Sequence, residues 1–288
     1  EISLGLVGSE MCIRDRVIIE RCRHSHKGDY GRLLLLGGTY PYGGAIIMSA
    51  IAAVKSGAGL VTVGTDKENI PALHSHLPEA MAFSLQDQQL LKEQLEKAEV
   101  VLLGPGLRED AFGEELVKRV FDSLRKDQIL IADGGALGIL AKAHLTFPSS
   151  QLILTPHQKE WERLSGIVLD HQNTEATARA LSAFPQRTIL VEKGSATRIW
   201  KAGQSEYYQL QVGGPYQATG GMGDTLAGMI AGFAGQFHQV SLYERVVAAT
   251  HLHSAIAQEL AQENYLVLPT EISKALPKTM KKISQKGS

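Results

Sequence analysis

The sequence is organised around one stretch, Ala218-Thr219-Gly220-Gly221-Met222-Gly223-Asp224-Thr225-Leu226-Ala227-Gly228-Met229-Ile230-Ala231-Gly232. Its glycines at positions 220, 221 and 223 leave the backbone uncovered, so their N–H groups can converge on an anion. From Thr225 onward the residues are small or apolar and predict a helix. A glycine-rich turn that runs into a helix start attracts anions, because the unpaired N–H groups and the positive end of the helix dipole point the same way. We therefore expect Gly220, Gly221, Met222 and Gly223 to form a phosphate-binding turn.

Asp224 stands at the junction of this turn and the helix, and two interpretations compete for it. A carboxylate cannot itself hold a phosphate, but it can accept the proton of a hydroxyl group that attacks one. Aspartate is also among the best helix N-cap residues. On this stretch alone the structural interpretation is favoured, and the rest of the chain must decide.

Composition and charge narrow the class of protein. The chain has 288 residues, of which 44% are hydrophobic and 20% charged, which is ordinary for a globular domain. The net charge of −1 favours neither nucleic acid nor an anionic membrane as a partner. No apolar run is long enough to span a bilayer, and no linker divides the chain, so we expect one domain over residues 17–288.

The first sixteen residues fit poorly with the rest of the chain. The run Ser9-Glu10-Met11-Cys12-Ile13-Arg14-Asp15-Arg16 resembles a peptide that recurs in predicted proteins as a translated sequencing artefact. We treat residues 1–16 as an atypical segment of non-native character and leave them out of the expected fold. The two cysteines, Cys12 and Cys22, make neither a metal-ligand spacing nor a disulfide framework, so the sequence predicts a cytoplasmic protein.

Apolar strand patterns alternate with helical patterns along most of the chain. Continuous apolar runs of this kind suit a parallel sheet that is covered on both faces. After the last of them, two alternating segments read as a hairpin at the edge of the sheet. The predicted strands are 32–36, 60–64, 100–103, 129–132, 152–154 and 188–191, the hairpin is 196–201 with 206–211, and the predicted helices are 43–56, 86–97, 111–125, 242–262 and a short C-terminal one.

Short glycine-rich or polar loops come after these strands, and loops at the carboxyl edge of a parallel sheet ring one crevice. Lys193, with hydroxyls at Ser195 and Thr197, suits nucleotide phosphates, although a solvated turn lysine is an equal alternative. Asp133 is a candidate catalytic carboxylate, helix cap or water-mediated magnesium ligand. His157 taken alone is more typical of a structural histidine.

The remaining histidines carry little functional signal. His24 and His26 share one face of an extended chain but lack a third ligand, so no metal site is predicted there. His251 and His253 do not share a helical face and read as structural or surface residues. Neither a Walker motif nor a proper Gly-x-Gly-x-x-Gly is present, which leaves the late glycine turn as the phosphate site.

The motifs in order resemble the ADP/ATP-dependent NAD(P)H-hydrate dehydratase family of the ribokinase-like superfamily. The resemblance runs from about His24 to the end of the chain, and the order of the motifs is more specific than any one of them. The motifs are His26-Lys27-Gly28-x-x-Gly31, Gly37-Gly38, Gly44-Ala45, Gly57-Ala58-Gly59-Leu60-Val61, Pro78-Glu79-Ala80-Met81, Gly104-Pro105-Gly106-Leu107, Asp133-Gly134-Gly135-Ala136-Leu137, Thr155-Pro156-His157-x-x-Glu160, Lys193-Gly194 and the late glycine turn.

The resemblance implies a ribokinase-like three-layer α/β/α fold with a central, mostly parallel sheet. It also implies a cofactor-repair lyase that dehydrates hydrated NADH or NADPH (S epimer) at the expense of ADP or ATP, with Mg²⁺ bridging phosphates. Hydroxide is a poor leaving group, so phosphorylation of the hydroxyl followed by elimination of phosphate is chemically sensible. The family further suggests a homotetramer.

Residue roles follow from the resemblance position by position. Asp224 would be the base that takes the hydroxyl proton, and the glycine turn would stabilise the transferring phosphoryl group. The expected contacts of the hydrated dinucleotide are Ala45, Gly106, His157 and Asp224, and those of the adenine nucleotide are Lys193, Gly194, Ser195, Ala196, Thr197 and Gly223.

The sequence departs from the family pattern at three places. Met222 stands where the family usually has Ser or Thr, although the backbone N–H survives that change. Val212-Gly213-Gly214-Pro215-Tyr216 replaces an Asn-x-x-Gly-Asn stretch, and Asp133-Gly134-Gly135 replaces Asp-Ala-Asp/Gly.

Two alternative functions remain. A ribokinase-like kinase of a vitamin precursor, of the hydroxymethylpyrimidine or hydroxyethylthiazole type, would share Asp224 and the glycine turn but lack the combination of His26-Lys27-Gly28 and Thr155-Pro156-His157. A non-catalytic nucleotide-binding protein is hinted at only by Met222. With the strand-end loops taken together, the catalytic interpretation of Asp224 becomes the favoured one.

Overall fold

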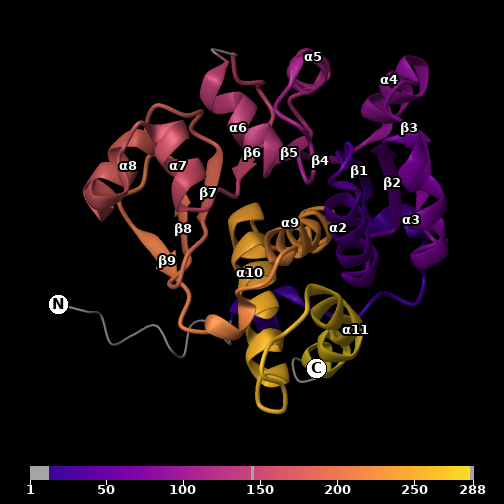
Figure 1. The fold of residues 1–288 in the computed structure, drawn as a ribbon. Helices are drawn as coiled ribbons and strands as arrows, with labels where there is room; N and C mark the ends of the chain where they lie inside the picture. Colours follow the sequence, from indigo (N-terminus) through magenta and orange to yellow (C-terminus); the bar gives the residue numbers. More distant parts are fainter. Residues whose placement is uncertain (1–12, 144–145, 286–288) are drawn as a thin grey trace.

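A nine-stranded sheet forms the centre of the computed structural model, which describes residues 13–143 and 146–285 (Figure 1). The strand order is β3-β2-β1-β4-β5-β6-β7-β8-β9; neighbouring strands from β3 to β7 are parallel, and β8 and β9 add an antiparallel hairpin at one edge. The strands are β1 (Arg32–Leu36), β2 (Leu60–Thr65), β3 (Met81–Ser84), β4 (Val100–Leu103), β5 (Ile129–Ala132), β6 (Gln151–Leu154), β7 (Thr188–Glu192), β8 (Arg198–Lys201) and β9 (Tyr207–Gln209).

Helices cover both faces of the sheet, and most of them connect one parallel strand to the next (Figure 1). None of the helices in the described ranges combines the length and the apolar character needed to cross a membrane. The α-helices are α2 (Gly43–Lys55), α3 (Ile70–His76), α4 (Gln88–Lys97), α5 (Ala111–Ser123), α6 (Gly135–Lys142), α7 (Gln158–Ser165), α8 (Thr174–Leu181), α9 (Met222–Ala234), α10 (Leu242–Leu260) and α11 (Pro269–Ser284), with short 3₁₀ turns η1 (Lys27–Tyr30), η2 (Lys67–Asn69), η3 (Leu169–His171) and η4 (Pro215–Gln217).

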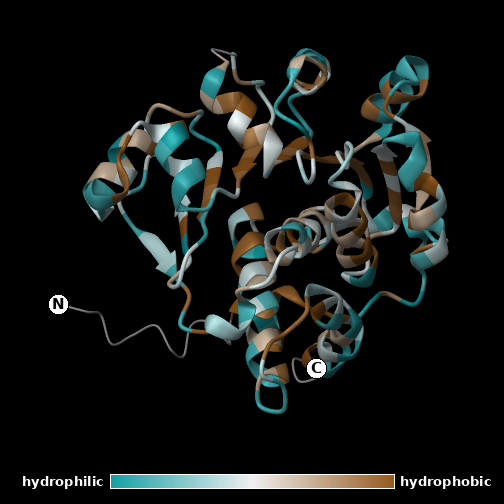
Figure 2. Ribbon diagram, in the orientation of Figure 1, coloured by the Kyte–Doolittle hydropathy of each residue, from teal (hydrophilic) through white to brown (hydrophobic). Residues whose placement is uncertain are grey.

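The alternation of side chains along β1 explains the three layers. Leu33 and Leu35 pack into the core shared with α2, α9, α10 and α11, whereas Leu34 and Leu36 pack into the core shared with α4 to α8. Because both faces are covered, the strand is apolar at successive positions rather than at every second one. Figure 2 shows the same pattern as apolar strands enclosed by helices with polar outer faces.

The predicted α/β fold, with its parallel strands and its edge hairpin, is confirmed. Several short elements were not predicted: α3, β3, α6, α7 and α8. The edge strand β3 is short, and its first residue Met81 is about half exposed, so β3 is less completely buried than the central strands. Helices α6 and α7 begin inside segments read as strand-end loops, directly after Gly134 and His157.

Residues 13–16, which the sequence interpretation left out of the expected fold, are part of the fold. Residues 13–17 are helical, Ile13 packs against the core, and Arg16 forms an ion pair with Glu244 at the start of α10. Leaving out residues 13–16 therefore has to be corrected, because Ile13 packs against the core and the Arg16 ion pair joins this segment to α10. Residues 1–12, with Cys12, lie outside the described residues, and Cys22 is free and exposed.

Close packing of α2 against α9 sets the position of the glycine turn. A Cβ atom on Gly228 would lie 2.1 Å from the carbonyl oxygen of Ser49, so only glycine permits this approach. One turn further along, a Cβ atom on Gly232 would lie 2.6 Å from the Cβ atom of Ser56. The two helices are thereby held together beside the carboxyl edge of the sheet, where the loops after the parallel strands also end.

Candidate active site

The glycine turn is the N-terminus of α9, and this helix begins earlier than predicted. It starts at Met222 rather than Thr225, with Gly221 as the N-cap in the left-handed region at φ +88°. The first helical bond runs from the N–H of Thr225 to the carbonyl of Gly221, at 3.0 Å. Asp224 is therefore a first-turn residue and not the cap, which corrects the structural interpretation of its role. The N–H groups of residues 222–224 face the helix N-terminus without helical acceptors.

Met222 contributes its backbone rather than its side chain to this turn. The side chain is partly buried and packs against the core on the α2–α9 face. A methionine is adaptable enough to fill such a gap. The departure from Ser or Thr thus removes a hydroxyl but leaves the N–H at the first helical position.

Lys193, directly after β7, places its ammonium over the turn. Its Nζ lies 2.8 Å from Oδ1 of Asp133, and a Cβ built on Gly223 would lie 3.1 Å from the same Nζ. Burial alone would lower the pKa of Lys193, but the carboxylates of Asp133 and Glu160 outweigh it and keep that pKa above its ordinary value. The ammonium is largely buried and paired with the Asp133 carboxylate, so the alternative of a solvated turn lysine is wrong.

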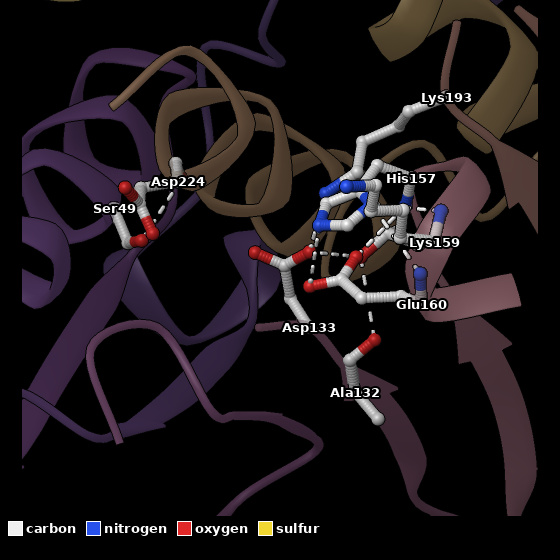
Figure 3. Close-up of polar contacts among 9 residues, drawn as sticks. Ser49, Ala132, Asp133, His157, Lys159, Glu160, Lys193 and Asp224 are labelled. Atoms are coloured by element: carbon white, nitrogen blue, oxygen red, sulfur yellow. Dashed lines mark hydrogen bonds and ion pairs between the residues drawn. The ribbon is translucent and has the colours of Figure 1, made fainter. Parts of the chain in front are cut away.

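Asp133 anchors this ammonium from the end of β5. Its carboxylate is almost fully buried, and Oδ1 accepts a hydrogen bond from the Lys193 ammonium (Figure 3). The same oxygen accepts a hydrogen bond from the hydroxyl of Thr155, at 2.7 Å. The N-cap of α6 is Gly134, so the helix-cap interpretation of Asp133 is wrong. A buried carboxylate survives here because a cation and a hydroxyl satisfy it.

Asp224 has the electrostatics of a general base. Burial, followed by the negative charge of Asp133, raises its pKa to about 6, against the lowering effect of Lys193. Its backbone carbonyl accepts a hydrogen bond from the hydroxyl of Ser49 on α2, at 2.8 Å (Figure 3). A carboxylate of this kind is ionised at neutral pH but basic enough to take a proton.

His157 and Glu160, at the N-terminus of α7, lie beside Lys193. His157 caps α7: its Nδ1 accepts from the N–H groups of Lys159 and Glu160, which places the ring proton on Nε2. Burial and the charge of Lys193 lower the pKa of His157, so the ring is neutral. The Glu160 carboxylate accepts the N–H of His157, and burial raises its pKa. His157 is exposed and is bridged to Lys193 through the backbone.

The other expected dinucleotide contacts meet at a second place. Gly106, after β4, has φ +65°, and a Cβ at this position would lie 3.0 Å from Cβ of Ala45 on α2. Ala45 precedes Ser49 by one helical turn, so it lies on the face of α2 that contacts the backbone of Asp224. The expected nucleotide contacts after Lys193 form the β7–β8 turn, which is exposed at Gly194, Ser195 and Ala196 and closed by a hydrogen bond from Thr197 to Gly194.

The remaining histidines do not add a metal site. No group of three or more His, Cys, Asp or Glu side chains within the described residues could hold a metal ion. His26 caps η1 through its Nδ1. His251 and His253 are both buried, so the interpretation as structural residues is confirmed and the interpretation as surface residues is wrong. Burial lowers the pKa of each to about 4.

Three residues at this place were assigned no site role from the sequence, although two of them belong to the Thr155-Pro156-His157-x-x-Glu160 motif: Ser49, Thr155 and Glu160. The Glu160 carboxylate could have been recognised from the spacing His157-x-x-Glu160, which is that of a capping box. The contacts of Ser49 and Thr155 join residues 175 and 22 positions apart, and no local pattern signals them.

These groups together suit phosphoryl transfer. The helix N-terminus and Lys193 offer donors to phosphate oxygens, and Asp224 stands in the same first turn as a base for an attacking hydroxyl. Positioning and electrostatic stabilisation supply most of the catalysis in such reactions.

Comparison with known proteins identifies relatives over nearly the whole chain. A sequence profile described as NAD(P)H-hydrate dehydratase matches residues 33–278. The ADP-dependent (S)-NAD(P)H-hydrate dehydratase of Streptococcus pneumoniae is 79% identical over 271 residues, which are 94% of this chain and 93% of that protein.

Two solved structures share the fold. A ribokinase-like superfamily protein from Enterococcus faecalis matches with a TM-score of 0.91 and 42% identity, over 96% of this chain and 95% of the other. The ADP/ATP-dependent NAD(P)H-hydrate dehydratase of Bacillus subtilis, crystallised with ATP and Mg²⁺, matches with a TM-score of 0.80 and 29% identity, over 95% and 97%. The fold is therefore ribokinase-like, as the motifs predict.

Proposed function

The chain belongs to the NAD(P)H-hydrate dehydratase family, and we therefore propose that it restores NADH and NADPH from their hydrates (S epimer), with ADP or ATP as phosphoryl donor. It is then a carbon–oxygen lyase for cofactor repair. The observation that carries the proposal is Asp224, a half-buried carboxylate whose pKa is raised to about 6, in the first turn of a helix whose N-terminus lies beneath the Lys193 ammonium.

The hydroxyl of the hydrated nicotinamide ring is activated in two steps. Asp224 accepts the hydroxyl proton while the oxygen attacks the terminal phosphoryl group of the nucleotide, so that ADP leaves as AMP. The phosphorylated carbon then loses inorganic phosphate, a far better leaving group than hydroxide. The neighbouring ring carbon gives up a proton to solvent, and the electron pair of that C–H bond restores the ring double bond. General-base help of this kind contributes about 10²–10⁴-fold in rate.

The glycine turn and Lys193 stabilise the charge that moves during transfer. The N–H groups of Gly220 to Gly223 and of the first helical turn donate to phosphoryl oxygens, and Lys193 neutralises charge while Asp133 keeps its ammonium in place. Such donors need no reorganisation when the reaction occurs. They act on any terminal phosphoryl group, so ADP and ATP both fit this part of the site.

The residues present fit a Mg²⁺ ion that is held mainly by the nucleotide. Asp133 is the nearest candidate ligand, but its Oδ1 already accepts from Lys193 and Thr155, and the described chain offers no cluster of three acidic, His or Cys side chains. Magnesium commonly keeps several waters and binds through phosphates with one or two carboxylates. When bound, the ion neutralises phosphate charge; Asp133 would reach it through water.

The proposed residue contacts with the two ligands rest on the family resemblance and are supported by where these residues lie. We assign the hydrated dinucleotide to Ala45, Gly106, His157 and Asp224, since Ala45 and Gly106 adjoin each other on the α2 side of the base. The adenine nucleotide is assigned to the β7–β8 turn and the helix N-terminus, through Lys193, Gly194, Ser195, Ala196, Thr197 and Gly223.

The family resemblance also supports an assembly and a location. We propose a cytoplasmic homotetramer whose subunits each contain one ribokinase-like domain over residues 17–288. Light scattering of the purified protein gives the mass directly: about four times the 31.2 kDa of the chain is expected, and a monomeric mass would contradict the tetramer.

The function is tested with purified hydrated NADH. Recovery of NADH absorbance is expected with ADP or ATP in the presence of Mg²⁺, and not without nucleotide. Absence of recovery with both nucleotides would refute the dehydratase. Phosphorylation of hydroxyethylthiazole or hydroxymethylpyrimidine under the same conditions would instead favour the vitamin kinase, and nucleotide binding without any turnover would favour the non-catalytic protein.

A further inference from the structure

Two exposed tyrosines stand on the loop between β1 and α2. Tyr40 is 77% and Tyr42 57% exposed, and neither has a role in the proposed reaction. Large aromatic side chains usually bury much of their area, so two of them in water on one short loop are unusual. Exposed aromatic groups of this kind are well suited to stacking against a flat ring.

The loop that carries these tyrosines is held firmly by hydrogen bonds. The N–H of Tyr40 donates to Asp66 at 2.7 Å, and the N–H of Tyr42 donates to the carbonyl of Thr39 at 2.7 Å. Thr39 in turn donates to the carbonyl of Gly106 through both its N–H and its hydroxyl. A braced loop presents its side chains at a low entropic cost on binding.

The position of this loop places the tyrosines near the hydrated dinucleotide and far from the adenine nucleotide. Tyr42 precedes Ser49 by seven residues, about 10 Å along α2, and Ser49 contacts the backbone of Asp224. From β1 to β7, however, the sheet runs through β4, β5 and β6, four strand spacings or about 19 Å. The tyrosines thus lie beyond Asp224 on the α2 side of the sheet, away from the β7–β8 turn.

We propose that Tyr40 and Tyr42 form a stacking platform for the adenine ring of the hydrated dinucleotide. This inference rests on the proposed function. The reacting ring must lie at Asp224, which leaves the far half of the same substrate to extend outward past Ala45 and Gly106. The carbonyl of Tyr42 accepts the N–H of Ala45, so the platform is continuous with that path.

The chemistry of the two rings favours adenine as the occupant. Hydration saturates a double bond of the nicotinamide ring and leaves it puckered, so it stacks poorly. Adenine keeps a flat aromatic face, and stacking of a base on an aromatic side chain needs no particular hydrogen bond. The tyrosine hydroxyls are therefore dispensable in this role, whereas the rings are not.

The experiment compares two substrates that differ only in the adenylyl half. Steady-state kcat/KM is measured, with ADP saturating, for hydrated NADH and for the hydrate of reduced nicotinamide mononucleotide. The wild-type enzyme should prefer hydrated NADH. Replacing both tyrosines by alanine should reduce kcat/KM for hydrated NADH about tenfold, in the range expected for loss of base stacking. The mononucleotide hydrate should be turned over at the wild-type rate, so the preference for the longer substrate collapses.

Three controls make the result decisive. The Tyr40→Phe/Tyr42→Phe enzyme should keep the wild-type preference, and so should Tyr265→Ala, which removes a fully exposed tyrosine from the α10–α11 loop. The KM for ADP should stay unchanged throughout. An equal loss for both hydrates, or an unchanged preference with an altered oligomeric mass, would overturn the platform and point to an interface between copies. If wild-type protein converts neither hydrate, the proposed function itself has failed.

Discussion

Asp224 shows at the scale of a single residue how neighbours create chemistry. Its position in the first turn of α9 would favour an ionised carboxylate through the helix dipole, but burial and Asp133 act in the opposite sense and raise its pKa to about 6. Lys193 keeps the shift moderate. The group is therefore mostly ionised at neutral pH and still accepts a proton readily.

The charge of Asp133 is expected to set part of the pH dependence of turnover. Because Asp224 must be ionised, the rate at saturating substrates should rise as the pH rises through about 6. In Asp133→Asn one of the causes that raise the pKa of Asp224 is lost, so the acid limb should move to lower pH by roughly 0.5–1 unit. The variant Asp127→Asn, which changes an exposed aspartate beside Arg125, should leave the limb in place. An upward shift in Asp133→Asn would contradict this role of the charge.

Asp224 should also lower the free energy of unfolding, and the size of this effect should depend on pH. Its pKa rises from 3.8 to about 6 on folding, so the folded state binds more protons between these values and the contribution to stability falls as the pH rises through them. Replacing the carboxylate in Asp224→Asn should therefore raise the free energy of unfolding by on the order of 1–2 kcal/mol at pH 8. At pH 4 the gain should vanish. Urea denaturation at both pH values checks this, and a gain of the same size at pH 4 would rule out a titration effect.

At the scale of elements, the packing of α2 on α9 places the site. Gly228 lets α9 approach Ser49 closely enough for the Ser49 hydroxyl to reach the carbonyl of Asp224. Small residues on both helices thus fix the height of the glycine turn above the sheet. This close packing determines where the N-terminus of α9 lies, because a larger side chain at Gly228 would push α9 outward.

A methyl group at this crossing should be costly. In Gly228→Ala the new Cβ would lie 2.1 Å from the backbone oxygen of Ser49, so the helices must separate, and we expect a loss of about 1–3 kcal/mol in the free energy of unfolding. Gly44→Ala, in α2 with no atom within 4 Å of the new Cβ, is the matched control. It should be neutral or stabilising by up to about 1 kcal/mol. Urea midpoints measure both, and equal midpoints for the two variants would show that the crossing tolerates the methyl group.

The sequence predicts strands well where both faces of the strand are covered by helices. The strands β1, β4, β5, β6 and β7 are continuous apolar runs, and such runs stand out without any tertiary knowledge. The edge strand β3 and the short helices α6 to α8 are stabilised mainly by what they pack against, so their local signal is weak.

The sequence pattern marks the residues of the candidate site but not the contacts between them. Lys193, Asp133 and His157 follow strands, and Asp224 lies in the first turn of α9. The ion pair of Lys193 with Asp133 spans 60 positions, and the buried Thr155 hydroxyl that shares the same oxygen has no signature of its own. The raised pKa of Asp224 depends on burial and on Asp133, which is distant in the sequence, and both are properties of the folded chain.

At the scale of the whole molecule, the sheet gathers distant segments at one edge. In the proposed complex the nucleotide lies between the end of β7 and the start of α9, two segments that are joined through the edge hairpin and η4. A nucleotide that bridges these two segments binds only the native chain. It should therefore stabilise the entire fold and not just a loop.

Lys193 should be responsible for much of the stabilisation that the bound nucleotide gives to the fold. At an ADP concentration of about 100 times Kd, the free energy of unfolding of the wild-type protein should increase by roughly 2.7 kcal/mol. In Lys193→Met the ADP-induced rise in Tm should be largely lost, whereas Lys201→Met, which changes an exposed lysine on β8, should retain it. Thermal scans with and without ADP distinguish the two. A full ADP response in Lys193→Met would mean that the ammonium does not serve the nucleotide.

The role of Asp224 as the base is tested most directly by comparing Asp224→Asn with the wild-type enzyme on hydrated NADH and ADP. NADH absorbance reports turnover, and calorimetry reports ADP binding on the same samples. We expect the variant to bind ADP with about the wild-type affinity while turnover falls by at least about 10²-fold, since only the proton acceptor is removed. Recovery of NADH by the variant at the wild-type rate would contradict the assignment of Asp224 as the base.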